Sequence, residues 1–405
     1  MAHGHSHGPV PEVAVGQRAR TTLIGFLAVV GVIAVAAMIW LWPSSTELSS
    51  ALQKVGDAPG VTYEDATINS VAIGCADAID SAACKTANVT INDGAYAGET
   101  ADVVLSGGSV NNGLRPGDII EIARVPTGDG EVVYSFSGVH RLPVLIALAV
   151  MFVVAVVAVA RLRGLLALVG LAAGAWILLG FMLPAVIVGK PGMAVALAGS
   201  TVIMFIVLYI AHGISLRTSA ALAGTLLGLA VITGLGAISV EMARLSGFAD
   251  ENEYDLSQLA PAINFQDLLM VGIIIGGLGV LNDVTITQAS AAWELRAAAP
   301  QWTRMQVFTA GMRIGRDHIA STIYTIVFAY AGSALTIILL LYFTARDTIA
   351  LLGQEMFAGE VVRTFASAIG LILSVPLTTG IAAITVGPAR TPDEEPKHSS
   401  APSPA

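Results

Sequence analysis

Apolar stretches with almost no charged residue recur along the chain. Each has roughly the 20 residues that an α-helix needs to cross the hydrocarbon core of a bilayer. Eight such stretches can be delimited: Thr21–Trp42, Leu142–Ala160, Gly164–Gly189, Gly192–Ala211, Thr218–Val240, Leu268–Trp293, Ile319–Ala345 and Thr364–Ala389. They predict an all-α polytopic membrane helix bundle of about eight transmembrane helices. Residues 21–42 would be the first helix, and residues 142–389 would form a seven-helix membrane domain.

A hydrophilic segment, residues 44–141, separates the first apolar stretch from the second. In it, short β-rich runs alternate with turns made of Asn, Asp, Gly and Pro. The runs are Asn88–Ile91, Ala101–Leu105 and Asp118–Arg124. This pattern predicts a small β-rich domain, folded as a barrel or a sandwich.

The distribution of Lys and Arg predicts how the chain is oriented. If the N-terminus is cytoplasmic, most basic residues that flank the apolar stretches fall on the cytoplasmic side, as the positive-inside rule requires. The first stretch exceeds the roughly 7–15 apolar residues of a signal peptide, so we interpret it as an uncleaved helix. We therefore expect two cytoplasmic tails, residues 1–20 and the disordered residues 390–405, and an extracytoplasmic β-rich domain.

Composition agrees with a membrane protein and excludes some other classes. Of the 405 residues, 55% are hydrophobic and 12% are charged, against roughly 25% charged in soluble domains. The net charge of −9 argues against a nucleic-acid partner, which would require a basic surface. The partners that we expect are the lipid bilayer and a small ion or solute or, alternatively, a protein that binds the extracytoplasmic domain.

The only two cysteines, Cys75 and Cys84, both lie in the hydrophilic segment. An extracytoplasmic compartment is oxidising, which favours a disulfide between them over two free thiols. Two cysteines supply too few ligands for a metal site. In the N-terminal tail, the alternating residues His3, His5 and His7 form a tract that can bind a transition metal weakly. The identity of any metal or cofactor stays unknown.

Polar residues interrupt the sixth apolar stretch, and a polar group inside a bilayer is costly enough to indicate function. They are Asn282, Asp283, Thr285, Thr287 and Gln288. If the helix ends near Leu281, the stretch is short for a crossing, whereas a helix that continues to Trp293 places Asp283 within the membrane region. The alternative to a functional site is a polar helix end at the cytoplasmic interface, with Asp283 solvated.

A second polar cluster precedes and opens the seventh stretch. It contains Asp317, His318, Ser321 and Thr322, with Arg313 and Arg316 as possible supporting residues or as anchors at the membrane surface. Just before it, the spacing of apolar residues in Pro300–Met312 suggests a helix lying on the cytoplasmic surface. His212 and Arg217, at the cytoplasmic end of the fourth stretch, are further supporting candidates. We expect Arg217, Arg313, Arg316 or His318 to hydrogen-bond Asp283 or Asp317.

Several of these motifs resemble the YibE/F family of bacterial multi-pass membrane proteins. The resemblance rests on residues 276–290 (GGLGVLNDVTITQAS), 293–296 (WELR), 315–322 (GRDHIAST), 212–218 (HGISLRT) and 375–379 (VPLTT). It implies a protein of the bacterial cytoplasmic membrane and no agreed activity. Asn282 stands where we expect an acidic residue in many relatives, which argues against a mechanism that needs two adjacent carboxylates.

These observations favour a transporter or permease for a small ion or solute. Asn282, Asp283 and the neighbouring polar residues of the sixth stretch would line its path, and Asp317 and His318 would relay charge. The alternative is an envelope assembly or scaffold protein whose extracytoplasmic domain binds a partner. A membrane enzyme ranks third because the chain has no Gly-x-Ser-x-Gly, His-Glu-x-x-His or phosphate-loop motif.

Overall fold

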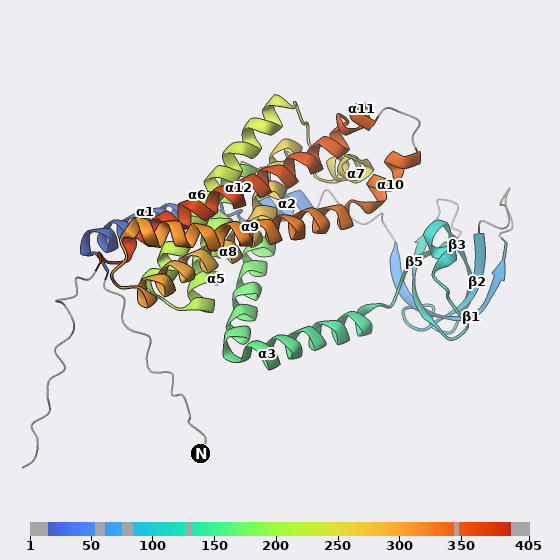
Figure 1. Ribbon diagram of the computed structural model, residues 1–405. Helices are drawn as coiled ribbons and strands as arrows, with labels where there is room; N and C mark the ends of the chain where they lie inside the picture. Colours follow the sequence, from blue (N-terminus) through green and yellow to red (C-terminus); the bar gives the residue numbers. More distant parts are fainter. Residues whose placement is uncertain (1–14, 53–60, 75–83, 127–131, 344–347, 390–405) are drawn as a thin grey trace, which may run out of the picture. The chain divides into compact units, whose positions relative to one another are not determined.

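The computed structural model describes residues 15–52, 61–74, 84–126, 132–343 and 348–389. It divides into two compact units (Figure 1). One unit is the segment Val55–Val159, which contains a small β-barrel, and the other combines the chain before Val55 with the chain from Ala160 onward. The N-terminal tail with its three histidines and the C-terminal tail, residues 390–405, lie outside the described residues.

Five strands form a closed barrel in the first unit: β1 (Thr62–Ile73), β2 (Cys84–Ile91), β3 (Thr100–Ser106), β4 (Ile119–Pro126) and β5 (Val132–Val139). Their order around the barrel is β1-β2-β3-β5-β4, and β4 closes it against β1. All neighbours are antiparallel except β3 and β5. Of the two predicted β architectures the barrel is confirmed. The sequence analysis identified parts of β2, β3 and β4 but neither β1 nor β5.

The barrel core follows from the alternation of side chains along each strand. Inward-facing Ile68, Val89, Val103 and Ile122 are buried almost completely. Cys84 opens β2 and is also buried. Cys75 lies outside the described residues, so the disulfide between the two stays a prediction.

The other unit is a bundle of helices. Its longer helices are α1 (Gln17–Leu41), α5 (Gly192–His212), α6 (Leu216–Met242), α8 (Phe265–Ala298), α9 (Arg304–Ser333) and α12 (Glu355–Thr385). Short helices are α2 (Ser45–Leu52), α4 (Leu183–Ile187), α7 (Glu251–Leu259), α10 (Leu335–Phe343) and α11 (Thr348–Leu352). The helix α3 (Leu142–Ile177) begins in the first unit and continues through a π-helical turn, Leu178–Met182, into α4.

Six helical stretches in the described part of the chain are long and apolar enough to cross a membrane, so the predicted count of eight is not confirmed. The predicted second and third helices lie in one stretch, Leu142–Ile187, which is interrupted at Arg161 by a non-helical backbone (φ 53°). The predicted seventh helix, Ile319–Ala345, is not among the six. Its described part is divided at Ala334 between the end of α9 and the short helix α10, and the rest of α9 is polar and carries Arg304, Arg313, Arg316 and Asp317. The helix expected over Pro300–Met312 begins at Arg304 and is the first part of the longer helix α9, and its position at a membrane surface stays a prediction.

Three helices, α6, α8 and α12, pack at the centre of the bundle (Figure 1). Glycines permit their close approach. A Cβ atom at Gly370 of α12 would overlap Ile232 of α6, and one at Gly224 of α6 would overlap Thr378 of α12.

One end of the bundle, which we call the Val386 end, is where α1 and α9 begin and α12 finishes. Val15, just before α1, forms an isolated antiparallel bridge with Val386, just after α12. The Nε atom of Arg304, the first residue of α9, donates a hydrogen bond of 3.3 Å to the carbonyl oxygen of Val386.

The opposite end, which we call the Lys190 end, is where α1 finishes and α5 and α8 begin. The Nζ atom of Lys190 lies 3.0 Å from Oε1 of Glu47, which follows α1. The backbone nitrogen of Gly192 donates a hydrogen bond of 2.8 Å to Asp267 in the first turn of α8.

The second half of α3 packs against α5 in the opposite direction. A Cβ atom at Gly170 would touch Val207, and one at Gly174 would touch Ile203. The two helices therefore run antiparallel. Because α5 starts at the Lys190 end, the segment that begins at Gly164 starts at the Val386 end.

Candidate functional site

The helix α8 carries the first predicted polar cluster and has no break. The side chain of Asn264 caps its start by accepting a hydrogen bond from the backbone of Asp267, and the helix continues to Ala298. Its 34 residues correspond to a length of about 51 Å at 1.5 Å per residue. The alternative in which the helix ends near Leu281 is therefore wrong, and Asp283 lies near the middle of a continuous helix.

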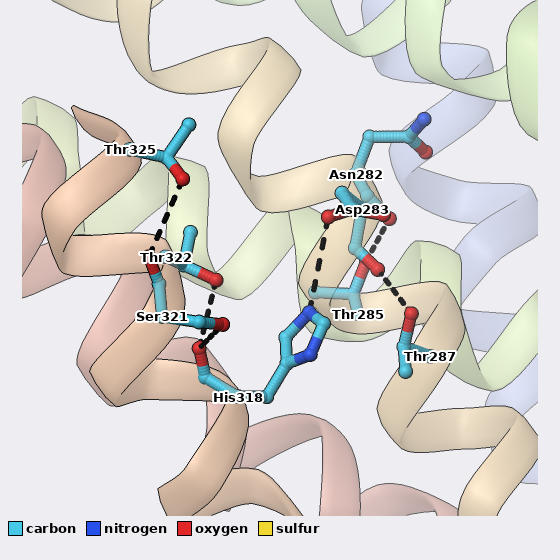
Figure 2. Close-up of polar contacts among 8 residues, drawn as sticks. All are labelled: Asn282, Asp283, Thr285, Thr287, His318, Ser321, Thr322 and Thr325. Atoms are coloured by element: carbon cyan, nitrogen blue, oxygen red, sulfur yellow. Dashed lines mark hydrogen bonds and ion pairs between the residues drawn. The ribbon is translucent and has the colours of Figure 1, made fainter. Parts of the chain in front are cut away.

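Asp283 faces His318 of the neighbouring helix α9 (Figure 2). The Nε2 atom of His318 lies 3.8 Å from Oδ2 of Asp283, which is within ion-pair range but too long for a hydrogen bond. The predicted hydrogen bond is therefore wrong, although the two residues are neighbours. In Figure 2 this pair is the only contact drawn between α8 and α9. Within the described residues, the Nε2 atom of His318 is buried and has no hydrogen-bond partner.

The predicted cluster on α8 divides between two faces of the helix. Thr285 and Gln288 are fully buried on the packed face, together with Leu281 and Val284. Asp283 lies on the other face, and 71% of its side chain is exposed. A position near the middle of the helix thus does not make Asp283 a residue of the bundle core. Asn282, beside it, is partly buried.

Buried polar side chains from three helices form what we call the inner polar layer, consisting of Thr225, Thr285, Gln288, Thr378 and Thr379. The hydroxyl oxygens of Thr225 and Thr285 lie 2.7 Å apart and link α6 to α8. Thr379 of α12 donates a hydrogen bond of 3.0 Å to Oε1 of Gln288. Within the described residues, Nε2 of Gln288 and the hydroxyl of Thr378 have no partner.

Sequence reasoning did not select Thr225, Thr378 or Thr379 as site residues. A helical hydroxyl is commonly satisfied by the carbonyl four residues earlier. Thr225 makes that bond, and Thr379 shares its single proton between the carbonyl oxygen of Val375 and Oε1 of Gln288. Such residues look ordinary in a sequence. The available signal is Pro376, which lies inside α12 and removes one backbone hydrogen-bond donor, followed by the hydroxyls of Thr378 and Thr379.

The predicted hydroxyls near the pair are held by their own helices (Figure 2). Ser321 and Thr322 both donate to the carbonyl oxygen of His318, at 3.0 and 2.9 Å. Thr287 donates to the carbonyl oxygen of Asp283 at 2.8 Å. These bonds position the hydroxyls without connecting α8 to α9.

The remaining predicted residues are not joined to the pair. Arg313, Arg316 and Asp317 are exposed on α9, and no ion pair or hydrogen bond links them to Asp283 within the described residues. His212 lies at the end of α5 and Arg217 at the start of α6. Within the described residues, neither forms a hydrogen bond or ion pair with Asp283 or His318. No group of three or more His, Cys, Asp or Glu residues that could hold a metal ion occurs in the described ranges.

Beyond Asp283, the same face of α8 carries small residues toward the Lys190 end. A Cβ atom at Gly279 would meet nothing within 4 Å, whereas one at Gly276 would lie 2.7 Å from the hydroxyl of Tyr330. Still further along, Gly272 lies beside the guanidinium of Arg363. Arg363 pairs with Glu360 at 2.6 Å, which confirms the ion pair that their i,i+3 spacing predicts.

Comparison with known proteins agrees with the resemblance drawn from the motifs. A model of the YibE/F-like protein family matches residues 148–388, which include α5, α6, α8, α9 and α12 and hence both faces of the candidate site. No curated protein and no solved structure matches the chain. The match extends over more than half of the sequence, and the chain belongs to the YibE/F-like protein family.

Proposed function

We propose that the chain is a permease for a small ion or solute, and that the path passes Asp283 and His318 on the outward face of α8. The observation that carries the proposal is the 3.8 Å approach of these side chains near the middle of two long helices. A carboxylate at such a position in a membrane protein is costly and is usually kept for function. Its oxygens suit a proton or a hard cation.

The pair has the chemistry of a charge relay. Histidine changes its protonation state within the physiological pH range. A protonated imidazole attracts a neighbouring carboxylate, whereas a neutral imidazole leaves the carboxylate free to bind a cation or a proton. His318 and Asp283 supply these two groups side by side. Further along the same face of α8, the hydroxyl of Tyr330 lies close to Gly276 and the guanidinium of Arg363 lies close to Gly272, so additional polar groups follow the pair along the helix.

A flux measurement tests this proposal. The full chain is reconstituted into liposomes loaded with a pH-sensitive dye and is challenged in turn with Na⁺, K⁺, Mg²⁺ and inorganic phosphate under an imposed pH gradient. We expect at least one of these ions to change the internal pH faster than in protein-free liposomes. Asp283→Asn should reduce that rate to the protein-free rate, and His318→Gln should reduce it as well.

The matched control is Glu294→Gln, which removes an exposed carboxylate three turns further along α8. It should leave flux unchanged, and gel filtration should show that all variants have the wild-type elution volume. Wild-type flux in Asp283→Asn, or the absence of flux with all four ions, would contradict the proposal.

The proposal includes a location and an orientation. We place the protein in the bacterial cytoplasmic membrane, with both termini in the cytoplasm and the barrel outside. The Lys and Arg distribution supports this orientation, and the Val15–Val386 bridge supports termini that share one side. A green fluorescent protein fused after residue 405 should fluoresce, whereas alkaline phosphatase fused there should be inactive.

A second candidate is an envelope scaffold that uses the barrel to bind a protein. The observation in its favour is that the barrel is a compact unit with its own hydrophobic core. Deleting residues 50–135 separates the two functions. A permease would retain ion flux in the liposome assay without the barrel, whereas a scaffold would have no flux to lose.

A further inference from the structure

An open groove of about 710 Å³ runs along the bundle near the Val386 end, between α1, α6 and α12. Its volume lies within the roughly 300–1,000 Å³ that small-molecule sites occupy. Most of its wall is apolar and is formed by Leu23, Phe26, Leu227, Ile381 and Ile384. The three helices are all long and apolar enough to span a membrane, so this wall lies where lipid is the surrounding solvent.

One end of the groove is cationic. Arg18, in the first turn of α1, and Arg304, at the start of α9, both line it. The bond from Nε of Arg304 to the carbonyl oxygen of Val386 fixes that guanidinium and leaves its two terminal nitrogens available. Among the described residues, neither arginine has a carboxylate within 4.0 Å, and no carboxylate lines the groove.

The beginning of α1 adds to this positive character. Gly16 caps the helix without a side-chain hydrogen bond, and the first turn has no acidic residue. Within the described residues, the cap residue therefore offers no side-chain acceptor to the backbone N–H groups of that turn, and the helix dipole favours an anion near them.

We propose that the groove binds one anionic phospholipid, with an acyl chain along the apolar wall and the phosphate between Arg18 and Arg304. A soluble anion would leave the apolar wall uncovered, and a zwitterionic lipid would leave the two guanidinium groups without a net counter-charge. Guanidinium groups bind phosphate through paired, charge-assisted hydrogen bonds. Basic pockets between transmembrane helices recognise anionic headgroups in the same way.

Lipid retention by the full chain tests the headgroup part of the proposal. The chain is reconstituted into nanodiscs with equal amounts of phosphatidylglycerol and phosphatidylcholine of identical acyl chains, and is then extracted with mild detergent. Mass spectrometry of the retained lipid should show phosphatidylglycerol enriched by about tenfold, as expected for charge-assisted bonds to phosphate. The double variant Arg18→Gln/Arg304→Gln should lose the enrichment, whereas Arg20→Gln, two residues along α1 and outside the groove, should keep it.

A second pair of variants tests the acyl-chain part. Thr22→Phe places an aromatic ring in the groove, while Thr21→Phe places the same ring on α1 outside the groove lining. Only the first should abolish retention. Equal retention of both lipids by the wild-type chain, or unchanged enrichment in the double arginine variant, would overturn the proposal. Phosphatidylglycerol that binds only after removal of residues 1–14 would assign the groove to the chain's own N-terminal segment and would also overturn it.

Discussion

The barrel and the bundle arrange polar and apolar side chains in opposite ways. In the barrel, Asn69, Asn88 and Asp102 form an exposed hydrogen-bonded row across β1, β2 and β3, while the interior is apolar except for the buried Glu64. In the bundle the outer surface is apolar, and hydrogen bonds such as Thr379 to Gln288 are buried. Each unit thus exposes the side chains that suit its surroundings.

The difference indicates what holds each unit together. Water drives the burial of apolar side chains in the barrel. In a bilayer the lipid is as apolar as the helix surface, so close packing of small residues and buried hydrogen bonds have to stabilise the bundle. Core truncation should therefore affect the barrel most, and the bundle should be sensitive to added volume and to lost hydrogen bonds.

The largest effect is expected in the barrel core. Ile122→Ala leaves a cavity in a fully buried position and should destabilise the barrel by about 2–5 kcal/mol. Val104→Ala, on the half-exposed face of β3, is the matched control and should have little effect. Hydrogen exchange measured by mass spectrometry should increase in β1 to β5 only, and a similar increase in α6 and α8 would contradict the separation of the two cores.

Added volume should destabilise the bundle. Gly370→Ala brings a methyl group against Ile232 and should cost about 1–3 kcal/mol by overpacking. The control, Gly234→Ala, has open space around the new methyl group and should stabilise α6 by about 0.5–1 kcal/mol. The two variants should shift the unfolding temperature in detergent in opposite directions, and equal shifts would show that helix propensity outweighs packing.

A lost hydrogen bond should matter more in the bundle than in the barrel. Thr379→Val removes the donor to Gln288 and leaves a buried acceptor unpaired, at a cost of about 1–3 kcal/mol. Thr67→Val removes an exposed bond to Asn92 in the barrel and should change stability by no more than about 0.5 kcal/mol. Chemical denaturation of each variant measures both values, and equal losses would mean that burial does not set the cost.

The smallest effect concerns an exposed ion pair at the Lys190 end. The backbone N–H of Ser44, assisted by Lys190, lowers the pKa of Glu47 from 4.5 to about 2. Because the folded-state pKa is depressed, the stabilisation is present above about pH 4.5 and is lost as the pH falls toward 2. The unfolding temperature of the wild-type chain should fall between pH 6 and pH 3, and in Glu47→Gln it should fall slightly less. An identical fall in both proteins would show that solvent screens the interaction between Glu47 and Lys190.

The sequence predicted the barrel and the long helices because their patterns are local. Alternating side chains and turn residues located β3 and β4 to within two residues of their observed bounds, and located the second half of β2. β1 is harder to recognise, since it contains several polar residues and its pairing with β2 is irregular between Ile68 and Ser70. The six apolar helical stretches are apolar on most of their surface, so their existence was clear although their packed faces were not.

The site was predictable in its residues but not in its geometry. Asp283 stood out as a charge in an apolar stretch, and His318 as a neighbour in a second cluster. In a soluble helix the polar face would have shown which residues point outward. In α8 the exposed and packed positions are similarly apolar, so the sequence could not separate Asp283 from Thr285 and Gln288. The contribution of Thr379 depends on α12 meeting α8, which no local pattern encodes.

The two ends of the bundle show in which direction each helix runs. α1 runs from the Val386 end to the Lys190 end, and the segment that begins at Gly164 runs in the same direction again. A chain that passes twice in the same direction through a membrane-spanning bundle needs a return segment between the two passes. Among the described residues between Leu41 and Gly164, the part of α3 before Arg161 is the helix whose length and hydrophobicity would allow such a crossing.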